Sequence, residues 1–356
     1  MNNDWMTALT CKPDLAIKKT AATRQDQLTK PRGSLGCLEE LAIRLAALQH
    51  MQQPCADKVR IVVFAGDHGV VEEGVSTYPQ SVTVEMVRNF ARGGAAISVL
   101  AKELNATLEV VNVGTVSDPG ELSGVLDQRV CDGTDNMTRS PAMNEQQLVR
   151  ALQTGRDAVN RAVEEKTNIF IGGEMGIGNT TAASAMACAI LNRSAADLVG
   201  PGTGLDDKGV KHKRAVIDKA LAFHGEALDD PLEALRCVGG FEIAALTGAY
   251  IACAQAGMPA LVDGFIASAA ALTACQLNAG VEDWLMYSHV SFEPGHRTIL
   301  QAQRVTPLID MKLRLGEGSG AAVVVPLIRL ACALHNNMAT FEEAGVKDKT
   351  SRHDSI

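Results

Sequence analysis

A glutamate held between glycines is the residue of this sequence with the clearest means of doing acid–base chemistry. Glu317 lies in the segment Gly316–Gly320 (GEGSG), where the flanking glycines let a ligand approach its carboxylate closely. Apolar surroundings would raise the pKa of this carboxyl by desolvation, which suits a general base. The same pattern fits a carboxylate at the start of a helix, stabilised by about 0.3–1 kcal/mol through the helix dipole. Residue types alone leave both interpretations open, and Glu174 is the second candidate carboxylate.

Two glycine-rich segments are typical of anion-binding loops. Gly172–Thr181 (GGEMGIGNTT) follows an expected strand and opens an expected helix, so backbone N–H groups and a helix N-terminus can face an anion. Gly200–Gly204 (GPGTG) precedes a basic run that contains Lys213. Together they offer the N–H donors and the positive charge that a monophosphate needs. A simple chain reversal in the first segment, and pairing of the lysines with Asp206 and Asp207 in the second, are the alternatives.

An aromatic ligand would find flat, polarisable surface in another part of the chain. Tyr78 and Pro79, with Met86 and Met175, offer such a surface, although methionine more often packs in a core. Leu315, beside the glycine-flanked glutamate, joins this candidate base-binding set.

The sequence lacks the motifs of several other enzyme classes. It contains no GxGxxG or GxxxxGK[ST] loop, no HExxH metal motif and no GxSxG nucleophile elbow. His68 is therefore expected to be structural or to orient a ligand, and no metal or other cofactor is expected. Nine cysteines without a CxxC pair are typical of reduced thiols in a cytoplasmic protein.

Charge and hydropathy exclude further classes. A formal net charge of −8 without a long basic run argues against nucleic-acid binding. The N-terminus has no basic-then-apolar signal sequence. The uncharged stretch 243–262 is the candidate membrane span, but no lysine or arginine occurs between Arg236 and Arg297. We expect a buried helix followed by a strand there, and no membrane span.

The elements that must position these loops predict an α/β fold. Apolar runs alternate with long helix-like segments, which is typical of a Rossmann-like parallel sheet flanked by helices. The expected strands are 59–65, 108–113, 168–171, 260–263 and 284–290, and the expected helices include 83–104, 144–165 and 180–191. Glycine-bearing loops follow the first four strands, and ligands of such sheets bind at the carboxyl ends of strands.

The two ends of the chain are expected to be helical. Residues 34–49 form an amphipathic pattern, and 321–337 form an apolar helix interrupted by Pro326. We therefore expect a small helical domain from 1–55 with 321–356, beside an α/β domain over 56–320.

Six ordered motifs carry a resemblance to one family. They are PRGSLG (31–36), AGDHGV (65–70), GGEMGIGNTT (172–181), VGGFE (238–242), VDGF (262–265) and RLGEGSGAA (314–322). Together, over about Thr20 to His335, they resemble the nicotinate-nucleotide–dimethylbenzimidazole phosphoribosyltransferases (CobT) closely.

The resemblance implies a reaction and roles for particular residues. Nicotinate mononucleotide and 5,6-dimethylbenzimidazole would give α-ribazole 5′-phosphate and nicotinate, for the nucleotide loop of cobalamin. Glu317 matches the family's catalytic glutamate and Glu174 a supporting carboxylate. The positions that match the phosphoribosyl site are Gly176, Gly178, Asn179, Thr180, Gly202, Thr203, Gly204 and Lys213, with Arg314 as a neighbour.

The resemblance also implies a homodimer with a small domain built from both termini. The base pocket varies in the family, so the base is a benzimidazole, a purine or a phenolic. The alternatives are a transferase using phosphoribosyl pyrophosphate, a non-catalytic nucleotide sensor and an NAD-linked oxidoreductase. The sequence lacks the acidic ribose loop expected of the first alternative and the GxGxxG loop expected of the third. The intact GEG motif argues against the sensor.

Overall fold

The computed structural model describes residues 3–202 and 204–347. Contacts between Cα atoms divide the chain into two compact units. The larger consists of Met1–Cys11 and Lys58–Val324, and the smaller of Lys12–Asp57 and Val325–Ile356. Residues 3–11 thus group with the sheet-bearing unit, whereas the sequence predicts them in the helical domain. The domain boundaries given above otherwise stay a prediction.

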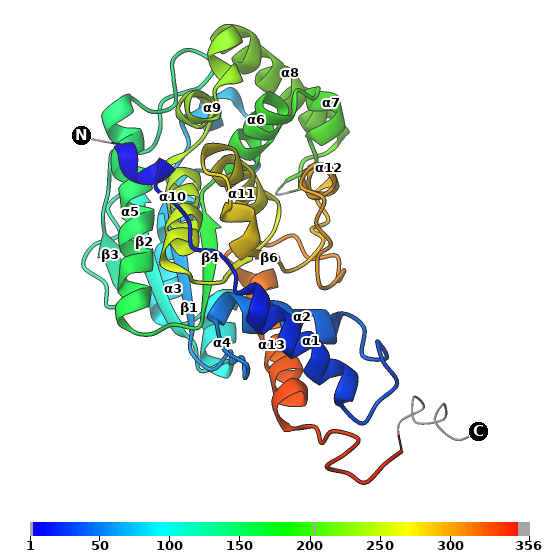
Figure 1. The fold of residues 1–356 in the computed structure, drawn as a ribbon. Coiled ribbons are helices and arrows are strands. Elements are labelled where there is room, and N and C mark those ends of the chain that lie inside the picture. The colour runs from blue at the N-terminus through cyan, green and yellow to red at the C-terminus, as the bar shows by residue number, and fades with distance from the viewer. Residues whose placement is uncertain (1–2, 203, 348–356) are drawn as a thin grey trace. The chain divides into compact units, whose positions relative to one another are not determined.

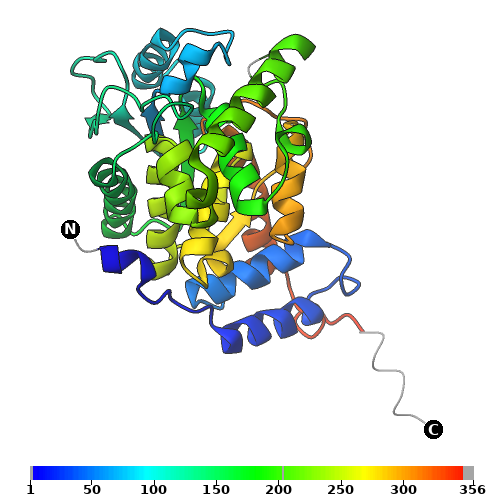
Figure 2. The ribbon, with the colours of Figure 1, turned by 90° about the horizontal axis from the view of Figure 1, so that it is seen from above.

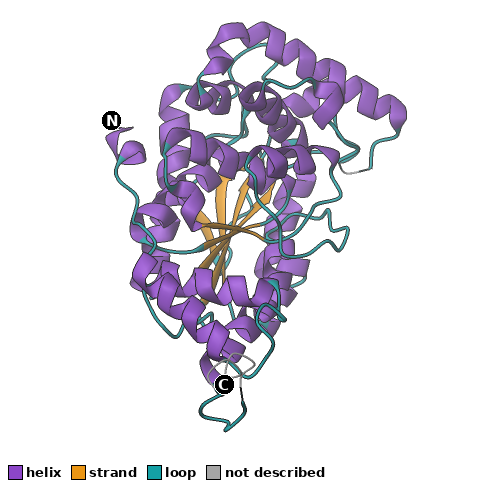
Figure 3. Cartoon of the chain, turned by 45° about the vertical axis from the view of Figure 1, so that its right-hand side comes forward, coloured by secondary structure: helices purple, strands orange, loops and turns teal. Residues whose placement is uncertain are grey.

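A six-stranded parallel sheet forms the centre of the larger unit (Figure 3). The strand order is β3-β2-β1-β4-β5-β6, and every neighbouring pair is parallel. The strands are β1 (Val59–Gly66), β2 (Thr107–Gly114), β3 (Val125–Asp127), β4 (Ile169–Met175), β5 (Ala260–Val262) and β6 (Leu285–Tyr287). This order is that of the doubly wound Rossmann sheet, so the predicted fold class is confirmed.

Helices flank the sheet on both sides (Figure 3). Those of the larger unit that matter below are α3 (Ser81–Arg92), α4 (Ala96–Glu103), α5 (Glu145–Glu164), α6 (Asn179–Leu191), α8 (Asp207–His224), α9 (Pro231–Val238), α10 (Phe241–Ala256) and α11 (Phe265–Leu277). Helix α10 contacts β1, β2 and β4 and lies between α5 and α11 (Figure 1). The stretch 243–262 therefore forms a buried helix and strand β5, as predicted.

Glycines let α5 and α10 approach very closely, side by side in Figure 2. A Cβ atom on Gly155 would collide with the carbonyl of Ala245, and one on Gly248 with the carbonyl of Leu152. Both positions are helical, so the need is for space and not for an unusual backbone conformation.

Replacing Gly155 by alanine is expected to destabilise the protein despite the better helix propensity of alanine. The added methyl group forces two packed helices apart, and overpacking of a core costs about 1–3 kcal/mol. Thermal unfolding of Gly155→Ala should show a lower Tm than the wild type. Asn160→Ala, at an exposed position of α5, should not lower it. An unchanged Tm for Gly155→Ala would contradict the close packing.

The smaller unit combines both ends of the chain. It contains α1 (Leu15–Gln27), α2 (Cys37–Gln49) and most of α13 (Ser319–Asn337). The guanidinium of Arg24 donates to the carbonyl of His335 at 2.8 Å, and the amide of Gln25 lies 2.9 Å from the imidazole of the same residue. Segments more than 300 residues apart thus pack on each other.

Helix α13 continues through Pro326, where the sequence predicts an interruption. The nearby residues Val325 and Ile328 are fully buried and hold the helix in place.

Among the described residues, α13 is the one helix whose length and apolar composition would let it cross a membrane. Since 56% of the scored window is buried in the protein, and core helices pass the same test, this is weak evidence for a span.

Two other expectations were incomplete. The single helix expected over 83–104 is two helices, α3 and α4, because Gly93 adopts a positive φ of 81° and ends the first. Strand β3 was not predicted, since its three residues are largely exposed and carry no apolar run.

Candidate active site

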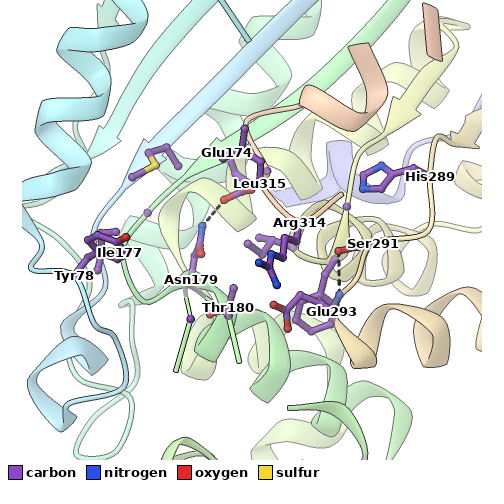
Figure 4. A pocket seen from close by; sticks show the side chains of 18 residues that line it. Tyr78, Glu174, Ile177, Asn179, Thr180, His289, Ser291, Glu293, Arg314 and Leu315 are labelled. Carbon is purple, nitrogen blue, oxygen red and sulfur yellow. Dashed lines mark hydrogen bonds between the residues drawn. The ribbon is translucent and has the colours of Figure 1, made fainter. Parts of the chain in front are cut away.

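A cavity of about 330 Å³ opens at the carboxyl ends of β4, β5 and β6 (Figure 4). Its volume lies within the range of small-molecule sites. Ten of the residues predicted for the site line it. They are Tyr78, Glu174, Met175, Gly176, Asn179, Thr180, Gly202, Gly204, Arg314 and Leu315. Residues of both loops expected to bind phosphate, three of the five residues expected to bind a base and one candidate carboxylate therefore share one cavity.

The loop after β4 leads into the N-terminus of α6, as the sequence predicted. Gly178 adopts a φ of 98° and is followed by Asn179, the first residue of α6. The amide of Asn179 donates to the carboxylate of Glu174. The N–H of Ile177 donates to the hydroxyl of Thr83 at 3.1 Å, and that hydroxyl donates to Asp67 at 2.5 Å. Thr83 of α3 thus connects Ile177 in the loop after β4 with Asp67 in the loop after β1.

A buried lysine stands behind this loop. Lys213 on α8 is 1% exposed, and its ammonium donates to the hydroxyl of Thr180 at 2.7 Å. Burial lowers the pKa of Lys213 to about 8, opposed by the charge of Glu293. Gly202 packs against both partners, because a Cβ there would lie 2.9 Å from Thr180 Oγ1 and 3.1 Å from Lys213 Nζ. Thr203, also predicted for this loop, lies outside the described residues.

Glu317 lies behind the wall of the cavity. Its neighbour Gly316 lines the cavity, whereas Glu317 itself does not, and Glu317 is 4% exposed. Its carboxylate accepts the N–H of Ile97 in the first turn of α4 at 3.3 Å. Its own N–H donates to the carbonyl of Glu174 at 3.3 Å. The two candidate carboxylates therefore belong to interlocked segments.

Burial raises the pKa of both carboxyls. For Glu174 the pKa lies well above the usual value, first through desolvation and then through the charges of Glu242, Asp263 and Glu317. For Glu317 desolvation again raises the pKa, the bond from Ile97 opposes it, and the charge of Asp263 adds to it. A carboxyl with a raised pKa is a better proton acceptor near neutral pH than an exposed one.

Three of the five residues predicted to bind a base line the cavity, and the binding itself stays a prediction. Tyr78, Met175 and Leu315 line the cavity, and the Tyr78 and Leu315 side chains are 51% and 59% exposed at its mouth. Pro79 is exposed outside the lining, and Met86 lies partly buried on α3. Gly178, predicted to bind phosphate, instead packs under Val71 and His68.

Several lining residues were not predicted from the sequence. They are Ile177, Gly264, Phe265, Ile266, His289, Ser291 and Glu293, together with Gly316. Most follow β5 and β6, so the rule that ligands bind at the carboxyl ends of strands would have found them. Glu293 points into the cavity beside Arg314 and Thr180 (Figure 4). Burial lowers the pKa of His289 to about 4, so this imidazole is neutral at neutral pH.

His68 is engaged in a buried pair. Its Nε2 lies 2.6 Å from the carboxylate of Glu242, and both side chains are almost completely buried. Within the described ranges no three His, Cys, Asp or Glu side chains are grouped so that they could hold a metal ion.

Known proteins resemble this chain over nearly its whole length. The phosphoribosyltransferase family model matches residues 11–346. The nicotinate-nucleotide–dimethylbenzimidazole phosphoribosyltransferase of a Pseudomonas putida strain is 59% identical, over 95% of this chain and 97% of that protein. The enzyme of the same name from a Pseudomonas aeruginosa strain is 58% identical, over 98% of this chain and 99% of that protein. The crystal structure of CobT from Thermus thermophilus is 45% identical, with a TM-score of 0.90 over 93% of this chain and 99% of that one.

These similarities agree with the geometry of the cavity and favour an enzyme over a nucleotide sensor. Family and fold both correspond to the resemblance found in the sequence motifs. The chain belongs to the phosphoribosyltransferase family that includes the nicotinate-nucleotide–dimethylbenzimidazole enzymes.

Proposed function

We propose that this enzyme transfers the phosphoribosyl group of nicotinate mononucleotide to 5,6-dimethylbenzimidazole or a related base. The products are α-ribazole 5′-phosphate and nicotinate, the former for the lower-ligand nucleotide loop of cobalamin. The observation that carries this proposal is one cavity with glycine loops beside a buried lysine and an apolar mouth. Glu174 lines this cavity, Glu317 lies behind its wall, and both carboxyls have a raised pKa. The names of the relatives support the same substrates.

The phosphate end of the substrate binds between the two glycine loops. Gly176 and the first residues of α6, Asn179 and Thr180, line this part of the cavity, and a helix N-terminus favours an anion. Gly202 and Gly204 close the other side, and Lys213 supplies charge through Thr180. A charge-assisted set of donors of this kind suits a monophosphate.

The base binds at the mouth of the cavity against Tyr78, Met175 and Leu315. A ring nitrogen attacks C1′ of the ribose with inversion, and the bond from C1′ to nicotinate breaks. Nicotinate leaves with the electron pair of that bond, which relieves its positive charge. The proton on the other ring nitrogen passes to Glu317, with Glu174 as the supporting carboxylate. No cofactor takes part in this scheme.

Positioning supplies much of the rate in such a scheme. A positioned general base contributes about 10²–10⁴-fold. Holding the ring nitrogen in line with C1′ contributes the rest. We further propose a cytoplasmic homodimer that binds no nucleic acid, with the helical and α/β domains bounded as the sequence predicts.

The test is turnover of nicotinate mononucleotide with dimethylbenzimidazole in the presence of EDTA, read by mass spectrometry. Formation of α-ribazole phosphate and nicotinate supports the proposal. A panel of benzimidazoles, purines and phenolics then identifies the preferred base. No product with any member of the panel would overturn the transferase function.

The activity is expected to fall on the acid side at a pH above the usual range of carboxyl titration. Glu317 and Glu174 must be ionised to accept a proton, and burial raises the pKa of both. The basic form is therefore lost as pH falls through a raised pKa, earlier than for an exposed carboxyl near 4.3. A profile of kcat between pH 4 and 8, with the fold monitored by circular dichroism, checks this. A limb that stays flat down to about pH 4 in folded protein would contradict it.

A further inference from the structure

One buried aspartate outside the predicted site connects the end of β5 to the segment that carries Glu317. Asp263 directly follows β5 and is 2% exposed. Its Oδ2 accepts the N–H of Gly318 at 3.2 Å, and its Oδ1 accepts the N–H of Ala321 at 2.9 Å. Each carboxylate oxygen thus holds one N–H shortly after Glu317.

The backbone held in this way has an unusual conformation. Gly316, Glu317 and Gly318 adopt positive φ values of 89°, 63° and 82°. Glycine tolerates this region, whereas a glutamate occupies it only when the surroundings determine it. Helix α13 begins at Ser319, so the N–H groups after Glu317 are those that a helix leaves without internal partners. Asp263, directly after β5, accepts hydrogen bonds from two of these N–H groups.

Neighbouring groups leave this segment little freedom to move. A Cβ atom on Gly173 of β4 would collide with the carbonyl of Glu317. A Cβ atom on Gly320 would collide with the imidazole of His289 and lie 2.9 Å from Asp263 Oδ1. The position of the Glu317 side chain is therefore set by β4, by the end of β5 and by the segment after β6.

We propose that Asp263 is a positioning residue for the transfer reaction, which holds the backbone of Glu317 so that its carboxylate meets the base. The inference rests on the proposed function, in which Glu317 is the proton acceptor. Asp263 does not line the cavity, and it acts through the two N–H groups and through its charge.

The charge of Asp263 supplies a second, measurable effect. It raises the pKa of Glu317, together with burial and against the N–H of Ile97 from α4. The pKa of Asp263 itself is raised to about 6 by burial, against its backbone N–H bonds. Glu174 from β4 is the other carboxylate in this group, and the nearby His289 is neutral. Removing the charge of Asp263 should therefore lower the pKa of Glu317.

A purely structural helix cap would behave differently, and the chain offers a matched control. Asp230 is an exposed N-cap whose carboxylate accepts the N–H of Leu232 at 2.9 Å at the start of α9. Asp263→Asn replaces one of two accepting oxygens by a donor that faces an N–H. Asp230 accepts a single N–H, which asparagine could keep, so Asp230→Ala is the variant that removes this cap outside the cavity lining. Comparison of the two separates lost capping from lost positioning.

The experiment measures kcat, KM for nicotinate mononucleotide and the acid limb of the kcat profile. For Asp263→Asn we expect kcat to fall about 100-fold, since misplacement by about 1 Å has that effect. We expect KM to change less than about threefold and the acid limb to move to lower pH. Asp230→Ala should lower Tm without changing kcat. Ala321→Pro, which removes one N–H in the first turn of α13, tests the same contact if Asp263→Asn does not fold.

A double variant tests whether Asp263 acts through Glu317. In a Glu317→Gln background, Asp263→Asn should cause little further loss, because the residue to be positioned is already inactive. Full additivity of the two substitutions would overturn the inference while leaving the transferase function in place. An unchanged kcat in folded Asp263→Asn, or a rise in KM as large as the fall in kcat, would do the same. No turnover by the wild type would overturn the proposed function, and this inference with it.

Discussion

Replacing Glu317 by glutamine should lower kcat at least a hundredfold with little change in the affinity for nicotinate mononucleotide. Glutamine keeps the shape of the side chain and can still accept the N–H of Ile97. It cannot take a proton from the attacking base. A positioned general base contributes about 10²–10⁴-fold, so its loss should appear in kcat. Steady-state kinetics with mass spectrometric detection of α-ribazole phosphate measures the effect.

The control for this variant is Glu164→Gln at an exposed position of α5. It makes the same chemical change far from the cavity and should leave kcat unaltered. Full activity of Glu317→Gln would show that the carboxylate is not the proton acceptor. Because Glu174 lines the cavity and Glu317 lies behind its wall, Glu174→Gln is the informative comparison. A larger loss in Glu174→Gln would assign proton removal to Glu174.

The sequence singles out Glu317 as a candidate but does not show which groups surround it. The GEGSG pattern predicts a closely approachable carboxylate near a helix start, and α13 does begin at Ser319. The partners of this segment, Gly173, Asp263 and Ile97, come from three other parts of the chain. Spacing along one sequence carries no information about contacts of this kind.

The sheet was predictable because its central strands are buried on both faces. Strand β1 is buried at every residue and β4 at all but the last, so each reads as a mostly apolar run, broken by Arg60 in β1 and Glu174 in β4. Strand β3 lies at the edge of the sheet, has three residues and is mostly exposed, and therefore gave no such signal. The break between α3 and α4 depends on the positive φ at Gly93, whereas a glycine pair in a helical pattern only permits a break.

The two glycine-rich loops were predictable from glycine spacing, but their contacts with other elements were not. Lys213 is close to Thr180 because α8 packs against α6, and the two residues are 33 positions apart. Glu293 was missed since a lone glutamate after a short strand has no distinguishing pattern. Met86 was placed in the base site because it is apolar and near Tyr78 in sequence. In the structure it lies on α3 outside the lining.

Removing the charge of Lys213 should weaken binding of the phosphate-bearing substrate strongly. The ammonium is 1% exposed and donates to Thr180 beside the cavity. Loss of one partner of a buried hydrogen-bonded charge pair costs about 2–5 kcal/mol, which is at least about 30-fold in affinity. KM for nicotinate mononucleotide should rise by that factor in Lys213→Met. Lys211→Met, on an exposed position of α8, should leave KM within about threefold of the wild type.

The wild type itself should show the same effect as a function of pH. Burial lowers the pKa of Lys213 from its usual value to about 8. The side chain is charged below that pH and neutral above it, so its attraction for phosphate is lost as pH rises through about 8. KM should therefore increase on the alkaline side in the wild type and stay level in Lys213→Met. A wild-type KM that is constant to pH 10, or a Lys213→Met protein that binds substrate normally, would show that phosphate binds elsewhere. The loop Gly172–Thr181 would then be a simple chain reversal, the alternative that residue types alone left open for it.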